Sequence, residues 1–298
     1  MTDSAEIHGI YPMLYAMFDS AGAIDSGAVA AEVEVCVANG AHGIAVGGLA
    51  SECNKLSTDE RRILMEAAAA ALDGRLPLSV TIAESNIEGQ VAMVRAAHEA
   101  GAAWAVLQPP PVKGASEAEL IRFYGAVADA SPIPIGIQNA PEYIGIGVSN
   151  AGFAELNRRH PNVSILKAEG PATYIAGLAA ETGGVFRLLN GRNGIDLIDS
   201  LHAGCHGMIP SVETVDVQTR IYEQVRAGED QAAERAFSEI LPLLYFLMQS
   251  IDHLLCYGKR LTARRIGLAE VHDRTPAQVP TAFGLEVLER WSKHLPAF

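Results

Sequence analysis

The chain has 298 residues, a formal net charge of −13, and 49% hydrophobic against 19% charged residues. Disordered chains combine low hydrophobicity with high net charge, so this composition predicts a folded protein. The 22 Lys and Arg residues form no cluster, so nucleic acid is not an expected partner. The longest apolar stretch, residues 240–251, has 12 residues, whereas a bilayer span takes about 20, so no membrane association is expected.

The N-terminal residues show no basic start and no apolar core before a small-residue cleavage site, so we expect no signal peptide. The four cysteines are scattered and none forms a CxxC pair. We therefore expect a cytoplasmic protein with reduced cysteines.

Short apolar runs alternate along the chain with longer segments of helical periodicity. Strands are predicted over residues 10–16, 43–46, 77–82, 104–108, 134–138, 163–167, 185–190 and 207–211. Helices are predicted over residues 26–39, 57–72, 87–100, 116–130, 150–160, 172–182, 194–203 and 213–227. Eight strands alternating with helices predict a (β/α)8 TIM barrel. A doubly wound open sheet is the alternative, disfavoured because no GxGxxG follows the first strand.

The last part of the chain breaks this rhythm and contains no strand pattern. A long helix is predicted from Gly228 to about Cys256, and a final helix over residues 281–295. We therefore predict a catalytic barrel over residues 1–227 and a C-terminal helical subdomain over residues 228–298.

Lys167 ends the sixth predicted strand, and active sites of barrels lie at the C-terminal ends of the strands. Burial there would disfavour the ammonium form and free a neutral amine, which can attack a ketone to form a Schiff base. The alternative is a surface lysine whose head reaches water. The other lysines, Lys55, Lys113, Lys259 and Lys293, lie in predicted loops or helices.

Other polar residues follow the ends of neighbouring strands. Glu169 lies two residues beyond Lys167, so an extended strand would put both side chains on one side, where the carboxylate could move protons or merely pair with the lysine. The glycine-containing loop at residues 47–52 could present backbone amides and the Ser51 hydroxyl to a carboxylate, or be a simple connection. Gln138 and Asn139 end the fifth strand and could bind polar substrate groups.

No group of His, Cys, Asp or Glu has the spacing of metal ligands, so no metal and no cofactor is expected. His202 and His206 have helical spacing, but the second stands at a strand entrance, away from the catalytic face. We interpret both as structural residues.

Taken together, these motifs resemble the dihydrodipicolinate synthase and N-acetylneuraminate lyase superfamily of class I, pyruvate-type aldolases. The resemblance covers nearly the whole chain and rests on five segments that follow strands two, four, five, six and seven: GGLASE (47–52), QPPP (108–111), IQNAP (137–141), ILK (165–167) and LLNG (188–191). It implies a barrel without a metal cofactor, a Schiff base on Lys167 and a homotetramer. It also implies that Gly48, Leu49, Ala50 and Ser51 bind the substrate carboxylate, and that Asn190 and Gly191 line the site.

Four departures from the family pattern bear on the substrate. Pro111 and Val112 stand where the family has tyrosines after the proline pair. The tyrosine that relays protons in the family is Gln138 here, and a glutamine has no titratable proton. The two hydroxyl residues of the family's strand-two loop are Leu49 and Ala50. Tyr143 stands where the synthase has an arginine for the carboxylate of its second substrate. A dihydrodipicolinate synthase proper is therefore disfavoured.

The remaining pattern is similar to 2-keto-3-deoxy sugar-acid dehydratases such as L-2-keto-3-deoxyarabonate dehydratase. The predicted function is a lyase that dehydrates a small 2-keto-3-deoxy acid, with Lys167 as the Schiff-base residue and Glu169 as the base. Three alternatives remain: a retro-aldol lyase that releases pyruvate, a metal-dependent barrel lyase, and a catalytically silent ligand-binding barrel.

Overall fold

The computed structural model describes residues 6–112 and 114–298, and Lys113 lies outside them. Eight parallel strands form one sheet in the order β1-β8-β7-β6-β5-β4-β3-β2. Single bridges from Met13 to Ala45 of β2 and to Ser211 join its ends, so the sheet closes. The strands are β1 Gly9–Ile10, β2 Ile44–Val46, β3 Leu78–Ile82, β4 Trp104–Leu107, β5 Ile135–Asn139, β6 Val163–Ala168, β7 Arg187–Asn190 and β8 Gly207–Met208. The predicted (β/α)8 TIM barrel is confirmed.

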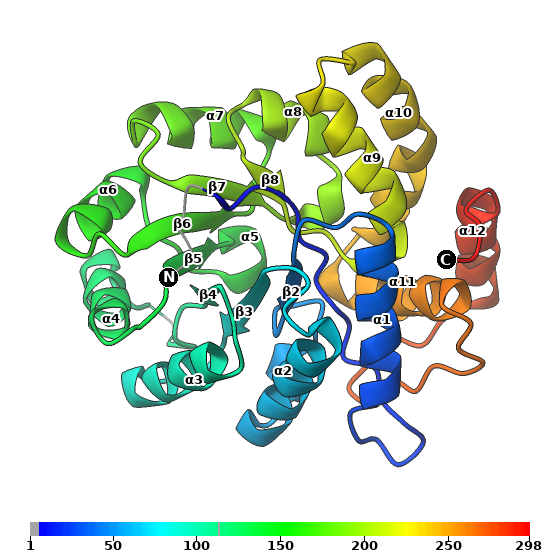
Figure 1. Ribbon diagram of the computed structural model, residues 1–298, viewed down its shortest axis with the longest axis horizontal. Helices are drawn as coiled ribbons and strands as arrows, with labels where there is room; N and C mark the ends of the chain where they lie inside the picture. The colour runs from blue at the N-terminus through cyan, green and yellow to red at the C-terminus, as the bar shows by residue number, and fades with distance from the viewer. Residues whose placement is uncertain (1–5, 113) are drawn as a thin grey trace.

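Helices surround the sheet in Figure 1. Those that follow the strands are α1 Ser26–Ala38, α2 Thr58–Leu72, α3 Ile87–Glu99, α4 Glu117–Asp129, α6 Asn150–Arg159, α7 Ala172–Glu181, α8 Leu197–His202 and α9 Val215–Arg226. Their starts follow local chemistry. Ser57 and Ser116 each form a reciprocal capping box with a glutamate three residues later. Asn86 and Ser149 accept from backbone N–H groups of α3 and α6.

The barrel wall is apolar on both faces, as expected of parallel strands covered by helices. One cluster of buried side chains fills the space between the sheet and the helices. A second cluster includes Tyr11 and Trp104, whose rings meet edge to face with centroids 5.6 Å apart. Polar side chains in this wall are therefore exceptions that need a reason.

The C-terminal segment is helical as predicted, but its helix boundaries differ from the prediction. One helix was expected from Gly228 to about Cys256, whereas the structure has α10 Asp230–Leu247 and α11 Ile251–Arg265, followed by α12 Ala282–Ser292. Ser250 caps α11 by accepting from the N–H of His253, so the helix is interrupted at residues 248–250. The short helix α5 Pro141–Ile144 was not predicted either. The break brings Met248 to the mouth of the barrel, as described below.

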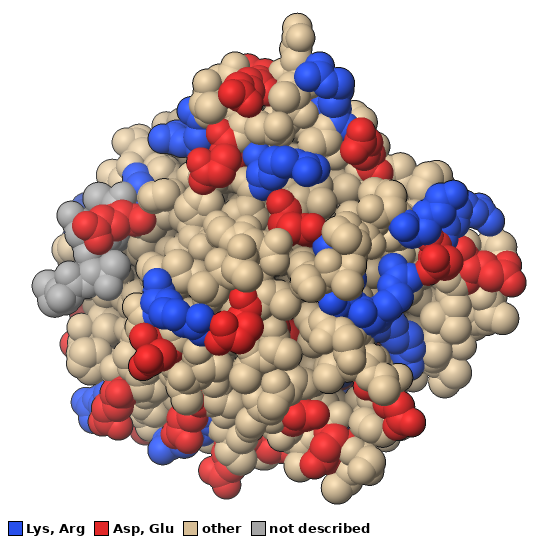
Figure 2. Space-filling model, turned by 45° about the vertical axis from the view of Figure 1, so that its right-hand side comes forward, with Lys and Arg blue, Asp and Glu red and all other residues tan. Residues whose placement is uncertain are grey.

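Acidic and basic side chains are interspersed on the face of the molecule that Figure 2 shows, with wide uncharged areas between them. The four cysteines are free and buried. In the described part of the chain, no helix combines the length and the apolar character needed to cross a bilayer.

Candidate active site

Lys167 and Glu169 meet inside the C-terminal end of the barrel. Lys167 is only 5% exposed, and its Nζ lies 3.0 Å from Glu169 Oε1. Gln138 lies beside Lys167 in the register of β5 and β6, and its Nε2 donates to the same Glu169 oxygen over 2.7 Å. Glu169 is 6% exposed, so its carboxylate depends on these two donors rather than on bulk water. The lysine therefore points into the barrel mouth and not toward solvent.

A chain of side-chain amides fixes the orientation of Gln138. Gln108 Nε2 donates to Gln138 Oε1 over 2.9 Å, which leaves the NH2 group of Gln138 for Glu169. Gln108 Oε1 in turn faces the Cys53 thiol at 3.7 Å. Gln90 donates to the backbone carbonyl of Gln108 over 2.9 Å. Because the Gln138 oxygen accepts from Gln108, the Gln138 NH2 group and not its oxygen faces Glu169.

A small cavity of about 30 Å³ lies against Lys167 and Glu169. Residues of four loops, those after β1, β2, β7 and β8, and residues at the α10–α11 junction complete its wall, namely Met13, Leu49, Ala50, Gly191, Arg192, Asn193, Ile209, Ser211, Met248, Ile251 and Leu254. This volume holds about one or two water molecules. A five-carbon acid is larger, so side chains at the mouth must move when a ligand of that size binds.

The loop after β2 contains two backbone N–H groups without a partner among the described residues. The N–H groups of Leu49 and Ala50 donate no hydrogen bond within the described residues, and both residues line the cavity. Ser51 behaves differently, because its hydroxyl donates to the Leu14 carbonyl and accepts from the N–H of Gly47. Ser51 is fully buried and holds the loop in shape. The carboxylate contact expected from the Ser51 hydroxyl therefore has no free hydroxyl proton to use.

Asn139 and Asn190 are likewise occupied by contacts inside the protein. Asn139 pairs with the backbone of Val148 through both ends of its amide and also donates to the Tyr174 hydroxyl. Asn190 donates to the Gly170 carbonyl and to Ser200 Oγ. Both side chains tie loops together behind the cavity wall. The expected contacts of these two residues with substrate stay a prediction.

Gly48 and Gly191 are glycines because neighbours approach them closely. A Cβ at Gly48 would lie 2.6 Å from Met13 Cε. A Cβ at Gly191 would lie 2.9 Å from Glu169 Oε2, so any side chain there would displace the carboxylate. Gly191 thus shapes the site by leaving room for Glu169, a role that its place in the LLNG segment alone does not reveal.

Comparison with known proteins agrees with this geometry. The chain matches the dihydrodipicolinate synthetase family over residues 6–279. The chain belongs to this family. A 4-hydroxy-tetrahydrodipicolinate synthase of Methanoculleus marisnigri is 31% identical over 79% of this chain and 82% of its own length. The L-2-keto-3-deoxyarabonate dehydratase of Azospirillum brasilense is 29% identical over 79% of this chain and 78% of its own length.

Solved structures share the fold. The wild-type sialic acid aldolase of Ruminococcus gnavus superposes with a TM-score of 0.88 at 21% identity, covering 97% of this chain and 96% of the aldolase. Members of the dihydrodipicolinate synthetase family are lyases that form a Schiff base, and this chain is a lyase of that family. The predicted resemblance is therefore confirmed, while the substrate is a separate question.

The family resemblance did not point to two parts of the site. Arg192 follows Gly191 directly and lines the cavity with Lys167. A charged residue just after a predicted strand end is a signal that could have found it. Met248 and Ile251 reach the cavity only because the helix breaks between them. The sole local signal for that break is the Ser250 cap, since neither glycine nor proline marks it.

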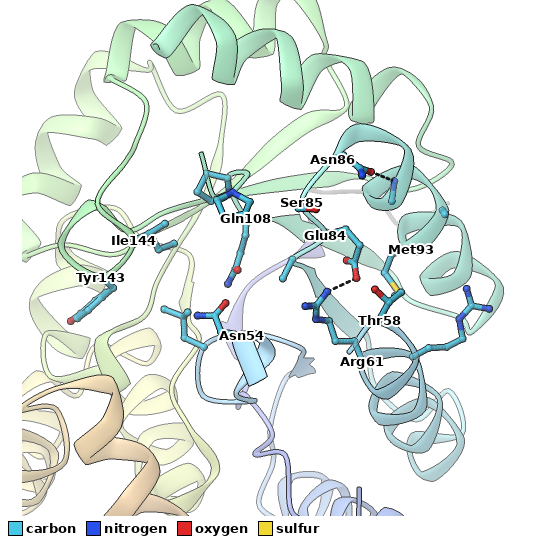
Figure 3. Close-up of a pocket in the computed structure, with 17 residues that line it drawn as sticks. Asn54, Thr58, Arg61, Glu84, Ser85, Asn86, Met93, Gln108, Tyr143 and Ile144 are labelled. Carbon is cyan, nitrogen blue, oxygen red and sulfur yellow. Dashed lines mark hydrogen bonds and ion pairs between the residues drawn. The ribbon is translucent and has the colours of Figure 1, made fainter. Parts of the chain in front are cut away.

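A larger cavity of about 690 Å³ lies on the far side of Leu49 and Gln108. Figure 3 shows Gln108 pointing toward Asn54, with the paired Arg61 and Glu84 on one side and Tyr143 on the other. This cavity contacts the amide chain through Gln108 but does not include Lys167 among its lining residues. The reacting groups are thus confined to the smaller cavity.

Lys259 is a second buried lysine, only 1% exposed, that the predicted helical context did not single out. Its Nζ lies 2.6 Å from Glu52 Oε1 and donates to the Ala16 carbonyl over 2.8 Å. It lines no described cavity and is held by these contacts, so it ties α11 to the β2 loop. Among the described residues, no group of three or more His, Cys, Asp or Glu side chains is placed to hold a metal ion.

Proposed function

We propose that the chain is a dehydratase of a 2-keto-3-deoxy sugar acid that works through a Schiff base on Lys167. The observation that carries the proposal is the contact of 3.0 Å between Lys167 Nζ and Glu169 Oε1, two buried side chains at the small cavity of the barrel mouth, with Gln138 in place of a titratable neighbour. Glu169 can take a proton from the lysine, which leaves a neutral amine as nucleophile. The amine attacks the C2 ketone and gives a carbinolamine. Its hydroxyl leaves as water with the proton that Glu169 took from the lysine, which gives the iminium and returns Glu169 to the carboxylate form.

The iminium withdraws electrons and makes the C3 hydrogens acidic. Glu169 removes one C3 proton, and the electron pair forms an enamine. The enamine then expels the C4 hydroxyl, which leaves as water with the proton that Glu169 took up. Hydrolysis of the imine releases the dehydrated keto acid and restores Lys167. General acid–base help of this kind contributes about 10²- to 10⁴-fold to the rate.

The free N–H groups of Leu49 and Ala50 support a site for the C1 carboxylate. Backbone donors that converge on a cavity bind anions without a charged side chain. The β2 loop lies across the barrel from β6, four strands away in either direction around the closed sheet. A short keto acid can then lie with its carboxylate at the loop and its ketone at Lys167. A homotetramer in the cytoplasm remains part of the proposal.

The proposal is tested with 2-keto-3-deoxypentonates and hexonates, with identification of the products. Dehydration of a pentonate gives α-ketoglutarate semialdehyde, and Lys167→Ala should abolish it. Pyruvate plus an aldehyde would indicate a retro-aldol lyase. Condensation of pyruvate with aspartate semialdehyde would indicate the synthase. Loss of turnover with a chelator would indicate a metal-dependent lyase, and ligand binding without any turnover a silent barrel.

A further inference from the structure

Arg192 occupies a strained loop at the edge of the Lys167 cavity. Its backbone φ is 51°, and that of Asn193 is 50°, so two consecutive non-glycine residues adopt the left-handed conformation. Residues other than glycine rarely adopt this backbone conformation, and it persists where the surrounding structure imposes it. Such strain clusters at functional sites, which makes the contacts of this loop informative.

Buried contacts hold the loop in this conformation. Asn193 Nδ2 donates to Glu213 Oε1 over 2.6 Å, and Asn193 Oδ1 accepts from the N–H of Ser211 over 2.8 Å. Glu213 is fully buried and also accepts from the Tyr15 hydroxyl over 2.9 Å. The barrel interior therefore anchors the residue next to Arg192, and this anchor sets the direction in which the arginine leaves the backbone.

The guanidinium of Arg192 is held at one end and unsatisfied at the other. Its Nη1 donates to Asp196 Oδ2 over 2.7 Å, and the guanidinium lowers the pKa of the Tyr143 phenol, which burial raises more strongly. The Tyr143 oxygen points away from Gln108 in Figure 3. Its Nε is buried and has no partner among the described residues. An unpaired buried donor carries a desolvation penalty, which a ligand oxygen at this point would remove.

The charges around Arg192 indicate which kind of ligand oxygen this position favours. Burial raises the pKa of Asp196, the guanidinium that it contacts lowers it, and the nearby Asp199 and Glu142 add smaller effects that raise it. One cation thus stands among three carboxyl groups. A second substrate carboxylate would meet net repulsion there, whereas a hydroxyl can accept from Nε–H at no charge cost.

We propose that Arg192 binds a hydroxyl group at the end of the substrate away from C1. The site then selects a monocarboxylic 2-keto-3-deoxy acid with a hydroxyl beyond C4 and discriminates against dicarboxylic acids. This inference rests on the proposed function, because it assumes that the ketone is bound at Lys167. Asp196 is a positioning residue in this arrangement, since it touches Arg192 and not the cavity.

Three acids that differ only at C5 test this assignment: a 2-keto-3-deoxypentonate with CH2OH, 4-hydroxy-2-oxopentanoate with CH3, and 4-hydroxy-2-oxoglutarate with a carboxylate. Binding is read as the concentration that half-saturates borohydride trapping, and turnover as kcat/KM. The wild type should prefer the pentonate over the methyl acid by about 10- to 100-fold, the effect of one hydrogen bond to a charged group. The dicarboxylic acid should be the poorest of the three.

Arg192→Met should remove this preference, so that the pentonate and the methyl acid half-saturate trapping at concentrations within about twofold of each other. Arg158→Met, which removes an exposed arginine of α6, is the matched control and should keep the preference. A preference that survives in Arg192→Met, or a wild type that favours the dicarboxylic acid, would overturn the inference alone. Wild-type protein that neither traps pyruvate nor turns over any of the acids would overturn the proposed function and the inference with it.

Discussion

The side-chain amide of Gln138 donates to Glu169 Oε1 over 2.7 Å, and the same oxygen lies 3.0 Å from Lys167 Nζ. One oxygen of Glu169 thus contacts both the potential nucleophile, Lys167, and the amide of Gln138, which only orients the carboxylate. A side-chain amide acts as neither an acid nor a base at neutral pH. Glu169 is therefore the sole titratable partner of Lys167 in this contact. The proton transfers of the proposed reaction are therefore assigned to Glu169.

Gln138→Leu should lower kcat/KM by about 10- to 100-fold, because Glu169 loses a donor that fixes its position. Gln108→Leu should act in the same direction with a smaller effect, since it only frees the amide of Gln138 to rotate. The double variant should be little worse than Gln138→Leu alone, because both changes act through one contact. Steady-state kinetics with the best substrate of the panel checks this. Additive losses, or a Gln138→Leu enzyme as active as wild type, would argue against the amide chain.

Glu213→Gln should destabilise the loop that carries Asn193. Both oxygens of Glu213 accept, from Tyr15 and from Asn193. An amide can keep its oxygen on Asn193 only if its NH2 turns to the Tyr15 hydroxyl, which must then accept and loses the acceptor for its own proton. Loss of one buried hydrogen bond costs about 1–3 kcal/mol in the free energy of unfolding, which denaturant titration measures. The selectivity between the pentonate and its methyl analogue should fall as well. Unchanged stability together with unchanged selectivity would show that Glu213 does not support this loop.

Glu60→Gln should change the pH dependence of stability. The bond from Arg274 and the Ser57 cap lower the pKa of Glu60 to about 2, against an ordinary value of 4.5. A lowered folded-state pKa means that the ionised group stabilises the fold above the unfolded pKa, and that this contribution is lost as pH falls toward about 2. The variant should therefore melt below wild type at neutral pH, and the gap in Tm should narrow in acid. A gap that stays constant with pH would contradict this linkage.

Met248→Ala should widen the mouth of the cavity. The volume of about 30 Å³ next to Lys167 is too small for the proposed substrate, and Met248 and Ile251 cover it from the α10–α11 junction. A methionine side chain has three rotatable bonds and is easily displaced, so its removal favours longer ligands. The ratio of kcat/KM for a hexonate over a pentonate should rise, by about 10-fold at most. A hexonate-to-pentonate ratio that falls would show that Met248 does not limit the length of the ligand.

The strands and most helices were predictable because each depends on local sequence. The helical periods, the serine caps and the apolar strand runs are all short-range signals, and most observed bounds differ from the predicted ones by a few residues. The first strand is the exception, because it was predicted over residues 10–16 and is observed only at Gly9–Ile10. The break at residues 248–250 was missed because its only local mark is the Ser250 cap inside a continuous apolar stretch. Tertiary contacts with the barrel mouth, which a single sequence does not display, accompany the break.

The site was predictable where strand geometry decides it and not where hydrogen-bond partners do. Lys167, Glu169 and Gln138 follow from the alternation of side chains along β5 and β6. The engagement of Ser51 with Leu14, by contrast, joins residues 37 positions apart. A polar residue at a barrel mouth can either contact the ligand or hold a loop in place. Only its hydrogen-bond partners show which of the two it does. The same reasoning explains why Arg192, which shares its cavity with the distant Lys167 and Met248, was not recognised.

Covalent trapping tests the central claim most directly. Protein incubated with saturating pyruvate and sodium borohydride is digested, and the modified peptide is identified by mass spectrometry. The account predicts a permanent adduct on Lys167, none on the buried Lys259, and none at all in Lys167→Ala. An adduct on another lysine, or no adduct in wild-type protein that still turns over a keto acid, would contradict it.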